Sequence, residues 1–166
     1  MMNPGLRIVA AVATVAVAQL GLVGLAVAPQ LTSRLTGEAY LMEVRPIDPI
    51  DPFRGAYVTL DYPGLRQAEG SIPPSMADGR SGQLFIPLVE RDGYWVAADW
   101  LRERPEHGPY LACEDREWRI RCGIESFFVS QERAQRLERE LARNGGVATI
   151  RIDDDGNASV VSVSGS

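Results

Sequence analysis

The sequence contains no lysine, a single histidine, His107, and two cysteines, Cys113 and Cys122. All 17 basic residues are therefore arginine. The absence of lysine excludes Schiff-base chemistry, Ser-Lys catalytic dyads and the phosphate-binding lysine of a P-loop. Because a structural zinc ion needs four histidine, cysteine or carboxylate ligands in a suitable spacing, we expect no metal and no cofactor.

Positive charge is outnumbered by negative charge, with 22 acidic residues and a formal net charge of −5. Every acidic residue lies between Glu38 and Asp155, and Arg7 is the one charged residue before Arg34. An acidic surface repels phosphate backbones, so we expect no nucleic-acid partner.

A long stretch without charge extends from Leu6 to Ala28, apart from Arg7 at its edge. As a helix it would measure about 34 Å, which is enough to cross a hydrocarbon core of roughly 30 Å. Ala26-Val27-Ala28 would also suit signal-peptide cleavage, but the apolar run is long for a signal peptide and Pro29 would follow the cut. We predict an uncleaved anchor, with cleavage as the alternative. A lipoprotein is excluded, because no cysteine follows the apolar run.

The chain therefore divides into a transmembrane anchor at residues 1–28, a polar stalk at 29–37 and one soluble domain at 38–166. A very short N-terminal tail before a span is typical of a signal-anchor, which leaves the domain outside the cytoplasm. We expect a single-pass protein of a bacterial cytoplasmic membrane with an extracytoplasmic domain. The opposite orientation, with a cytoplasmic domain and reduced cysteines, is the alternative.

The soluble domain combines alternating apolar patterns with turn residues, which predicts an antiparallel, β-rich α+β fold. One helix is expected from Ser130 to about Arg143, with Ala134, Leu137 and Leu141 on its apolar face and Gly145 after its end. The expected strands lie at residues 39–44, 57–62, 83–90, 94–97, 110–113, 118–122, 147–152 and 158–163.

A proline-rich loop precedes the second strand and contains Asp48, Pro49, Asp51 and Pro52. It leads into Arg54-Gly55-Ala56-Tyr57-Val58-Thr59-Leu60-Asp61-Tyr62. This run resembles the signature of the GDYXXLXY family of bacterial membrane-anchored proteins. The likeness extends to the N-terminal span, to Gly37 and to the later segment Gly123-Ile124-Glu125-Ser126-Phe127-Phe128-Val129, and so covers nearly the whole chain.

The resemblance implies a membrane-anchored extracytoplasmic domain and brings no biochemical activity with it. The family motif maps onto Asp48, Pro49, Asp51, Pro52, Gly55, Tyr57, Leu60, Tyr62, Gly123, Ile124 and Glu125. The aspartate of the family motif falls at Ala56, so any role of that carboxylate is absent here.

Cys113 and Cys122 fall on the two strands of one expected hairpin. Two cysteines in an exported domain often form a disulfide, which would add roughly 2–3 kcal/mol to the free energy of unfolding in the chain-entropy model. Two unpaired buried thiols are the alternative, because the strand register is not fixed by the sequence.

Three groups of acidic or aromatic residues suggest chemistry, and each also has a structural interpretation. Asp48 and Asp51 precede prolines and are expected to form turns rather than a calcium or acid–base site. The run Asp153-Asp154-Asp155 lacks the spacing of an EF-hand and is expected to be a hairpin turn. In a strand Leu60 and Tyr62 share one face and Tyr57 takes the other, so core packing accounts for at least one face.

No serine lies in a nucleophile-elbow context, and we expect no enzyme. The leading hypothesis is a non-catalytic interaction module of the cell envelope that contacts lipid through residues 6–28 and binds another membrane or envelope component. The alternative is a hydrolase or small-ligand binder that uses the proline-rich loop, Tyr57, Tyr62 and Glu125.

Overall fold

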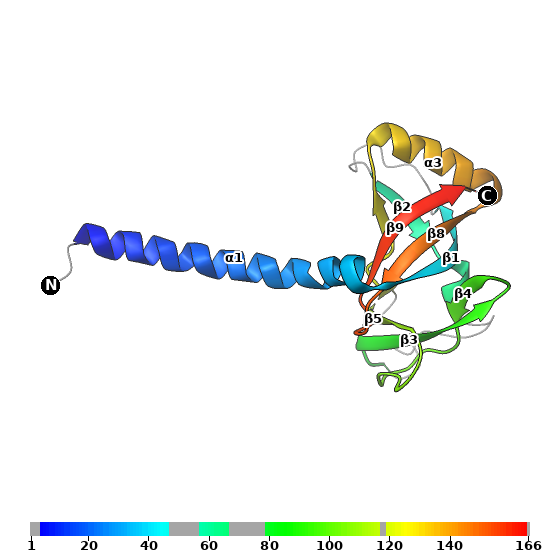
Figure 1. The fold of residues 1–166 in the computed structure, drawn as a ribbon, viewed down its shortest axis with the longest axis horizontal. Coiled ribbons are helices and arrows are strands. Elements are labelled where there is room, and N and C mark those ends of the chain that lie inside the picture. Colours follow the sequence, from blue (N-terminus) through cyan, green and yellow to red (C-terminus); the bar gives the residue numbers. More distant parts are fainter. Residues whose placement is uncertain (1–3, 47–56, 67–78, 117–118, 166) are drawn as a thin grey trace.

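The computed structural model describes residues 4–46, 57–66, 79–116 and 119–165. An N-terminal helix is followed by two antiparallel sheets and by a second helix near the C-terminus, as the sequence predicts. Figure 1 shows the N-terminal helix projecting from the β-rich domain as one continuous rod.

Helix α1 (Pro4–Thr36) is apolar on every side. Its segment Ala11–Ala28 has a mean hydropathy of 2.1 and is not buried against the rest of the chain, so it is long and apolar enough to cross a membrane. Leu20 and Leu25 are 72% and 75% exposed to the surroundings. An isolated helix with this surface is stable in lipid and unfavourable in water.

The predicted stalk is the helical end of α1 and packs against the domain. Ser33 is fully buried, and the last turns of α1 contact strands β8 (Gly146–Ile152) and β9 (Ala158–Gly165). The amide of Gly37 donates to the Ser33 carbonyl at 3.1 Å. A Cβ at Gly37 would lie 2.9 Å from the Ile152 backbone, so only glycine permits this close approach. Helix α1 is therefore joined to the domain without a flexible linker.

The first sheet has the strand order β7-β2-β1-β8-β9, with β1 (Glu38–Pro46) at its centre. Strand β1 pairs with β8 along its length, from Glu38↔Ile152 to Val44↔Gly146. Strand β2 (Tyr57–Asp61) pairs with β1 on one side and with the short strand β7 (Ser126–Phe128) on the other.

The second sheet has the order β4-β3-β5-β6. Its strands are β3 (Gly82–Arg91), β4 (Tyr94–Ala97), β5 (Tyr110–Arg116) and β6 (Arg119–Arg121). Both predicted hairpins are present. Asp92 and Gly93 adopt positive φ in the two-residue turn between β3 and β4, which is typical of a tight hairpin.

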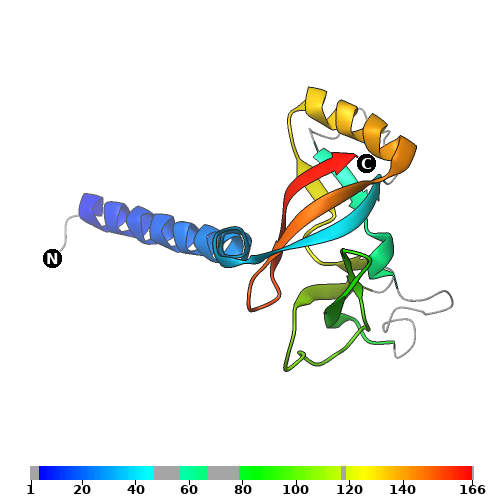
Figure 2. The same ribbon diagram turned by 45° about the vertical axis from the view of Figure 1, so that its right-hand side comes forward.

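Helix α3 (Gln131–Asn144) lies at the opposite end of the domain from the second sheet (Figures 1 and 2). It buries Ala134, Leu137 and Leu141, as predicted, and Gly145 ends it with a φ of 72°. Ser130 precedes the helix but makes no side-chain capping bond, contrary to the expected role. Both sheets and α3 share one hydrophobic core, which includes Met42, Leu60, Leu84 and Ile150.

Candidate binding cleft

A cleft of about 840 Å³ lies where the end of β2 approaches the second sheet. One side comes from β2 and from the short 3-10 helix η1 (Pro63–Leu65), and the other from β6 and the segment that joins it to β7. The lining comprises Tyr57, Thr59, Leu60, Asp61, Tyr62, Leu65, Arg66, Ile86, Trp100, Ile120, Arg121, Cys122, Gly123, Ile124, Glu125 and Ser126.

Strand β2 places alternate side chains in different surroundings. Val58 and Leu60 are buried in the core, whereas Tyr57, Thr59 and Asp61 are partly exposed. This alternation follows from the pleat of a strand, in which successive side chains point to opposite faces. Tyr57 therefore lies on the face opposite Leu60, as predicted, and its ring contacts Phe128 of β7 at a centroid distance of 5.7 Å.

Glu125 holds the segment Cys122–Glu125, here called the 122–125 segment, in a tight turn. Its carboxylate accepts hydrogen bonds from the backbone amides of Cys122 and Gly123. Its backbone carbonyl accepts from the Leu60 amide at 2.9 Å. Gly123 has a φ of 81°, which a residue with a Cβ rarely adopts. The carboxylate thus stabilises the turn and is already occupied by two donors.

Tyr62 ties the same segment to the end of β2. Its side chain is 6% exposed, and its hydroxyl donates to the Ile124 carbonyl at 2.8 Å. Burial, together with the nearby Glu125 carboxylate, raises the pKa of Tyr62 well above its ordinary value. Ile124 itself is 1% exposed. The hydroxyl therefore stays protonated at any physiological pH and acts as a structural donor.

A disulfide between Cys113 and Cys122 links the first residue of the 122–125 segment to strand β5. The two Cα atoms are 4.2 Å apart, and the residues follow directly on the pairs Glu114↔Arg121 and Asp115↔Ile120. Cys113 is buried, whereas Cys122 lines the cleft. The segment is thus held by a covalent bond, by its carboxylate and by β2.

The facing side of the cleft carries an ion pair and an aromatic ring. Arg66 contacts Asp61 at 2.6 Å, and the Arg66 side chain is 71% exposed. The Trp100 indole N–H donates to the Leu65 carbonyl at 3.3 Å. An exposed pair of this kind stabilises a fold little, so Arg66 can exchange Asp61 for a ligand at small cost.

The structure brings together the motif residues that lie within its described ranges. Tyr57 and Leu60 of β2, with Tyr62 just after it, meet Gly123, Ile124 and Glu125 at one cleft, although the two groups are about sixty residues apart in the chain. Asp48, Pro49, Asp51, Pro52 and Gly55 lie outside the described residues.

Sequence reasoning missed the other residues of the cleft. Arg66 follows η1, Trp100 lies between β4 and β5, and Arg121 ends β6, and nothing in the local sequence distinguishes the two arginines. Trp100 gave the single usable signal, because a tryptophan between two expected strands often covers apolar surface. The short strand β7 was also missed.

The other carboxylates singled out from the sequence form a turn. The Asp153 carboxylate accepts from the amides of Asp155 and Asn157 and from the Asn157 side chain. This is the hairpin turn that the sequence predicts between β8 and β9. Within the described residues, no three histidine, cysteine, aspartate or glutamate side chains lie close enough to hold a metal ion.

Comparison with protein families gives one match. The family model described as "GDYXXLXY protein" matches residues 19–163, which is most of the chain. Comparisons with curated proteins and with solved structures give no match.

Proposed function

Because this chain belongs to the GDYXXLXY family, and because the motif residues that the structure describes meet at one cleft, we propose that it is a membrane-anchored binding module of the bacterial cell envelope. In this proposal α1 crosses the cytoplasmic membrane once, the domain lies outside the cytoplasm, and a segment of another envelope protein binds in the cleft. The module is non-catalytic.

Support for the anchor comes from α1. The segment Ala11–Ala28 combines a high mean hydropathy with full exposure, and the core helix of a soluble protein would instead be buried. Support for the outer location comes from the disulfide between Cys113 and Cys122, because such bonds persist in oxidising compartments and are rare in the cytoplasm.

One observation carries the binding role: the cleft has a rigid side and an adaptable side. The 122–125 segment is fixed by the disulfide, the Glu125 carboxylate and the Tyr62 hydroxyl. Opposite it, the exposed Arg66 is held by one ion pair. A preorganised surface loses little conformational entropy on binding, while a mobile arginine supplies a directional hydrogen-bond donor.

The same geometry speaks against Glu125 and Tyr62 as groups of a hydrolase. A general base must be free to take a proton from water or substrate. Glu125 would first have to give up two backbone donors, and Tyr62 would have to lose its proton against a strongly raised pKa. Small-ligand binding is the second candidate, favoured by the cleft volume of about 840 Å³, which is within the usual range for ligand pockets.

Photo-crosslinking in living cells tests the proposal. A benzophenone amino acid replaces Thr59, which lines the cleft, or Val89, which is exposed on β3 outside it. We expect a discrete polypeptide adduct from position 59 and none from position 89. Identical adducts from both positions would count against the cleft as the binding site.

Absence of any polypeptide adduct would reject the protein partner. Native mass spectrometry of the detergent-purified chain then decides the second candidate, which requires a bound small molecule that is lost when Trp100 is replaced by alanine. The topology is tested separately by a C-terminal fusion to a phosphatase that is active only outside the cytoplasm. We expect this fusion to show phosphatase activity.

A further inference from the structure

The charges of α1 mark the depth at which the domain sits. Arg7 and Arg34 are the two charged residues of this helix. They are separated by about 40 Å along the helix axis, at 1.5 Å per residue. A bilayer including both headgroup layers is about 40–45 Å thick. A span centred between the two arginines places each at the level of the lipid phosphates.

The domain begins immediately beyond this level. Strand β1 starts at Glu38, and the close contact of Gly37 with Ser33 and Ile152 leaves no linker that would let the domain move away from the bilayer. The junction between α1 and the β8–β9 hairpin is therefore held in the headgroup layer.

Arg151 lies at this junction beside Arg34. Its guanidinium donates to the Arg34 carbonyl, one of the last four carbonyls of α1. A guanidinium carries five N–H groups, so this bond leaves donors for a second acceptor. Within the part of the chain that the structure describes, no ion pair joins Arg34 or Arg151 to a carboxylate.

Two exposed leucines extend the apolar surface of α1 to the same depth. Leu31 and Leu35 are 53% and 69% exposed, and they lie one turn apart on the side of the helix away from the buried Ser33. Leu31 precedes Arg34 by three residues and is suited to contact the lipid below the headgroups, whereas Leu35 lies at the level of the arginines, which contact the phosphates.

On the basis of the anchoring proposed above, we infer that Arg34 and Arg151 bind lipid phosphate groups and hold the domain flat against the membrane. Arginine recognises phosphate by paired hydrogen bonds, which fits this geometry. Two carboxylates of neighbouring segments have other partners: Glu38 accepts from the Tyr40 hydroxyl at 3.0 Å, and Asp155 pairs with Arg104 at 3.2 Å. Because the domain is acidic, an anionic membrane would not attract it as a whole. The contact therefore depends on the lipid phosphates next to Arg34 and Arg151 and does not require an anionic membrane.

Solid-state NMR of the full-length chain in phosphatidylcholine bilayers tests the inference. Arginine guanidinium groups are labelled with carbon-13 and nitrogen-15, and dephasing by phosphorus-31 reports those in contact with phosphate. We expect dephased signal in the unaltered chain and partial loss of it in Arg34→Gln and again in Arg151→Gln. Arg34→Gln keeps the backbone carbonyl that Arg151 binds, so it tests the contact without removing the junction bond.

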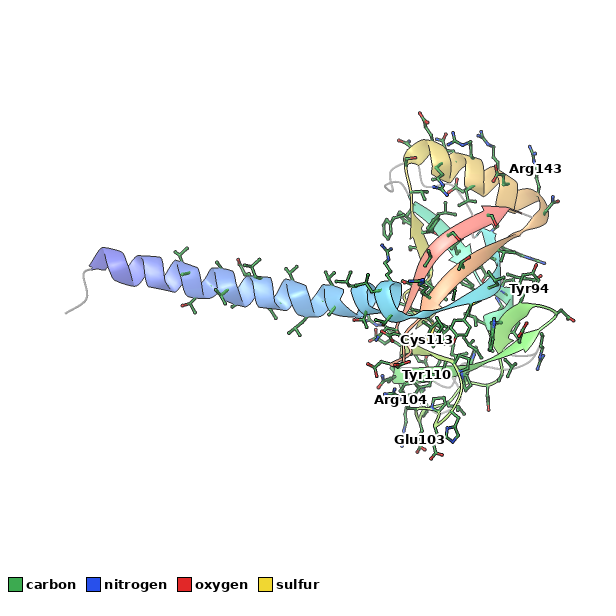
Figure 3. All side chains as sticks on the ribbon, viewed as in Figure 1. Tyr94, Glu103, Arg104, Tyr110, Cys113 and Arg143 are labelled. Carbon is green, nitrogen blue, oxygen red and sulfur yellow. A yellow bond between two sulfur atoms is a disulfide. The ribbon has the colours of Figure 1, made fainter. Side chains whose placement is uncertain are left out.

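Arg143→Gln is the matched control, because Arg143 lies at the end of α3 far from α1 (Figure 3). The variant loses the signal of one guanidinium, but the amount of dephased signal should equal that of the unaltered chain. Equal dephasing in all four proteins would overturn the inference. Flotation with vesicles after an alkaline wash is measured on each sample: loss of flotation means that the anchor itself fails, whereas flotation without dephasing refutes the phosphate contact alone.

Discussion

Helices α1 and α3 have opposite surfaces. Helix α1 exposes its apolar side chains in all directions between Ala11 and Ala28, as Figure 3 shows. Helix α3 buries Ala134, Leu137 and Leu141 and exposes arginine, glutamate and glutamine. The same backbone structure is thus adapted to two solvents, because an apolar surface is favourable in lipid and a charged surface is favourable in water.

The largest expected effect comes from truncating a core leucine of α3. Leu141 is 1% exposed, so Leu141→Ala should lower the free energy of unfolding of the domain by about 2–5 kcal/mol. Leu25→Ala in α1 removes the same atoms from a side chain that is 75% exposed and should leave it unchanged. Chemical denaturation in detergent measures both. Equal losses would show that α1 is packed against protein.

A charge in the middle of α1 should act on insertion instead of folding. Leu20→Arg is expected to make membrane integration less favourable by about 2.5–3.5 kcal/mol, the cost of arginine near the centre of a span. Gln135→Arg on the exposed side of α3 is the control and should have no effect. The fraction of chain that resists alkaline extraction is the measurement. Full integration of Leu20→Arg would contradict the lipid-facing role of α1.

The disulfide sharpens the comparison, because it reports the compartment in which the β-rich domain, including α3, lies. Replacing both Cys113 and Cys122 by serine should lower the free energy of unfolding by roughly 2–3 kcal/mol. The unaltered chain in reductant should fall to the same value. If reductant leaves the free energy of unfolding unchanged and chemical labelling finds two free thiols in the unaltered chain, the disulfide is absent from the native protein.

A smaller effect is expected at the junction of β2 with the 122–125 segment. Tyr62→Phe removes the donor to the Ile124 carbonyl and leaves a buried acceptor without its partner. The expected loss is about 1–3 kcal/mol. Tyr94→Phe on the β3–β4 hairpin is the control (Figure 3). Thermal unfolding measures the stability of both variants. If Tyr62→Phe is as stable as the unaltered chain, the Tyr62 hydroxyl does not contribute to the rigidity of the 122–125 segment.

The smallest effect is expected from alkaline titration, which ionises tyrosines of the domain and leaves α1 unchanged. Burial, with a contribution from Glu38, raises the pKa of Tyr40 to about 12, against about 10 in the unfolded chain. A raised pKa means that the folded state binds the proton more tightly, so the contribution is complete below about pH 10 and is lost between about pH 10 and 12. The melting temperature of Tyr40→Phe should decline less steeply over this interval. An identical slope would exclude Tyr40 as a source of the alkaline loss.

Local patterns predicted most elements of the fold. The period-2 alternation of Tyr57 to Tyr62, the helical spacing of Ala134, Leu137 and Leu141, and the turn Arg91-Asp92-Gly93 each contain their own structural signal. Strand β7 escaped prediction because three residues are too short to show a period, and its pairing partner Tyr57 lies about seventy residues earlier.

The sequence alone determined that one helix is long and apolar enough to cross a membrane and that a β-rich α+β domain follows it, because hydropathy and periodicity are properties of neighbouring residues. Only the tertiary structure decided that Cys113 faces Cys122, that Glu125 and Tyr62 fix the same turn, and that the last turns of α1 pack on β8 and β9. These features depend on strand register and on chain segments that are distant in sequence, and a shift of one residue in register would turn each side chain to the other face.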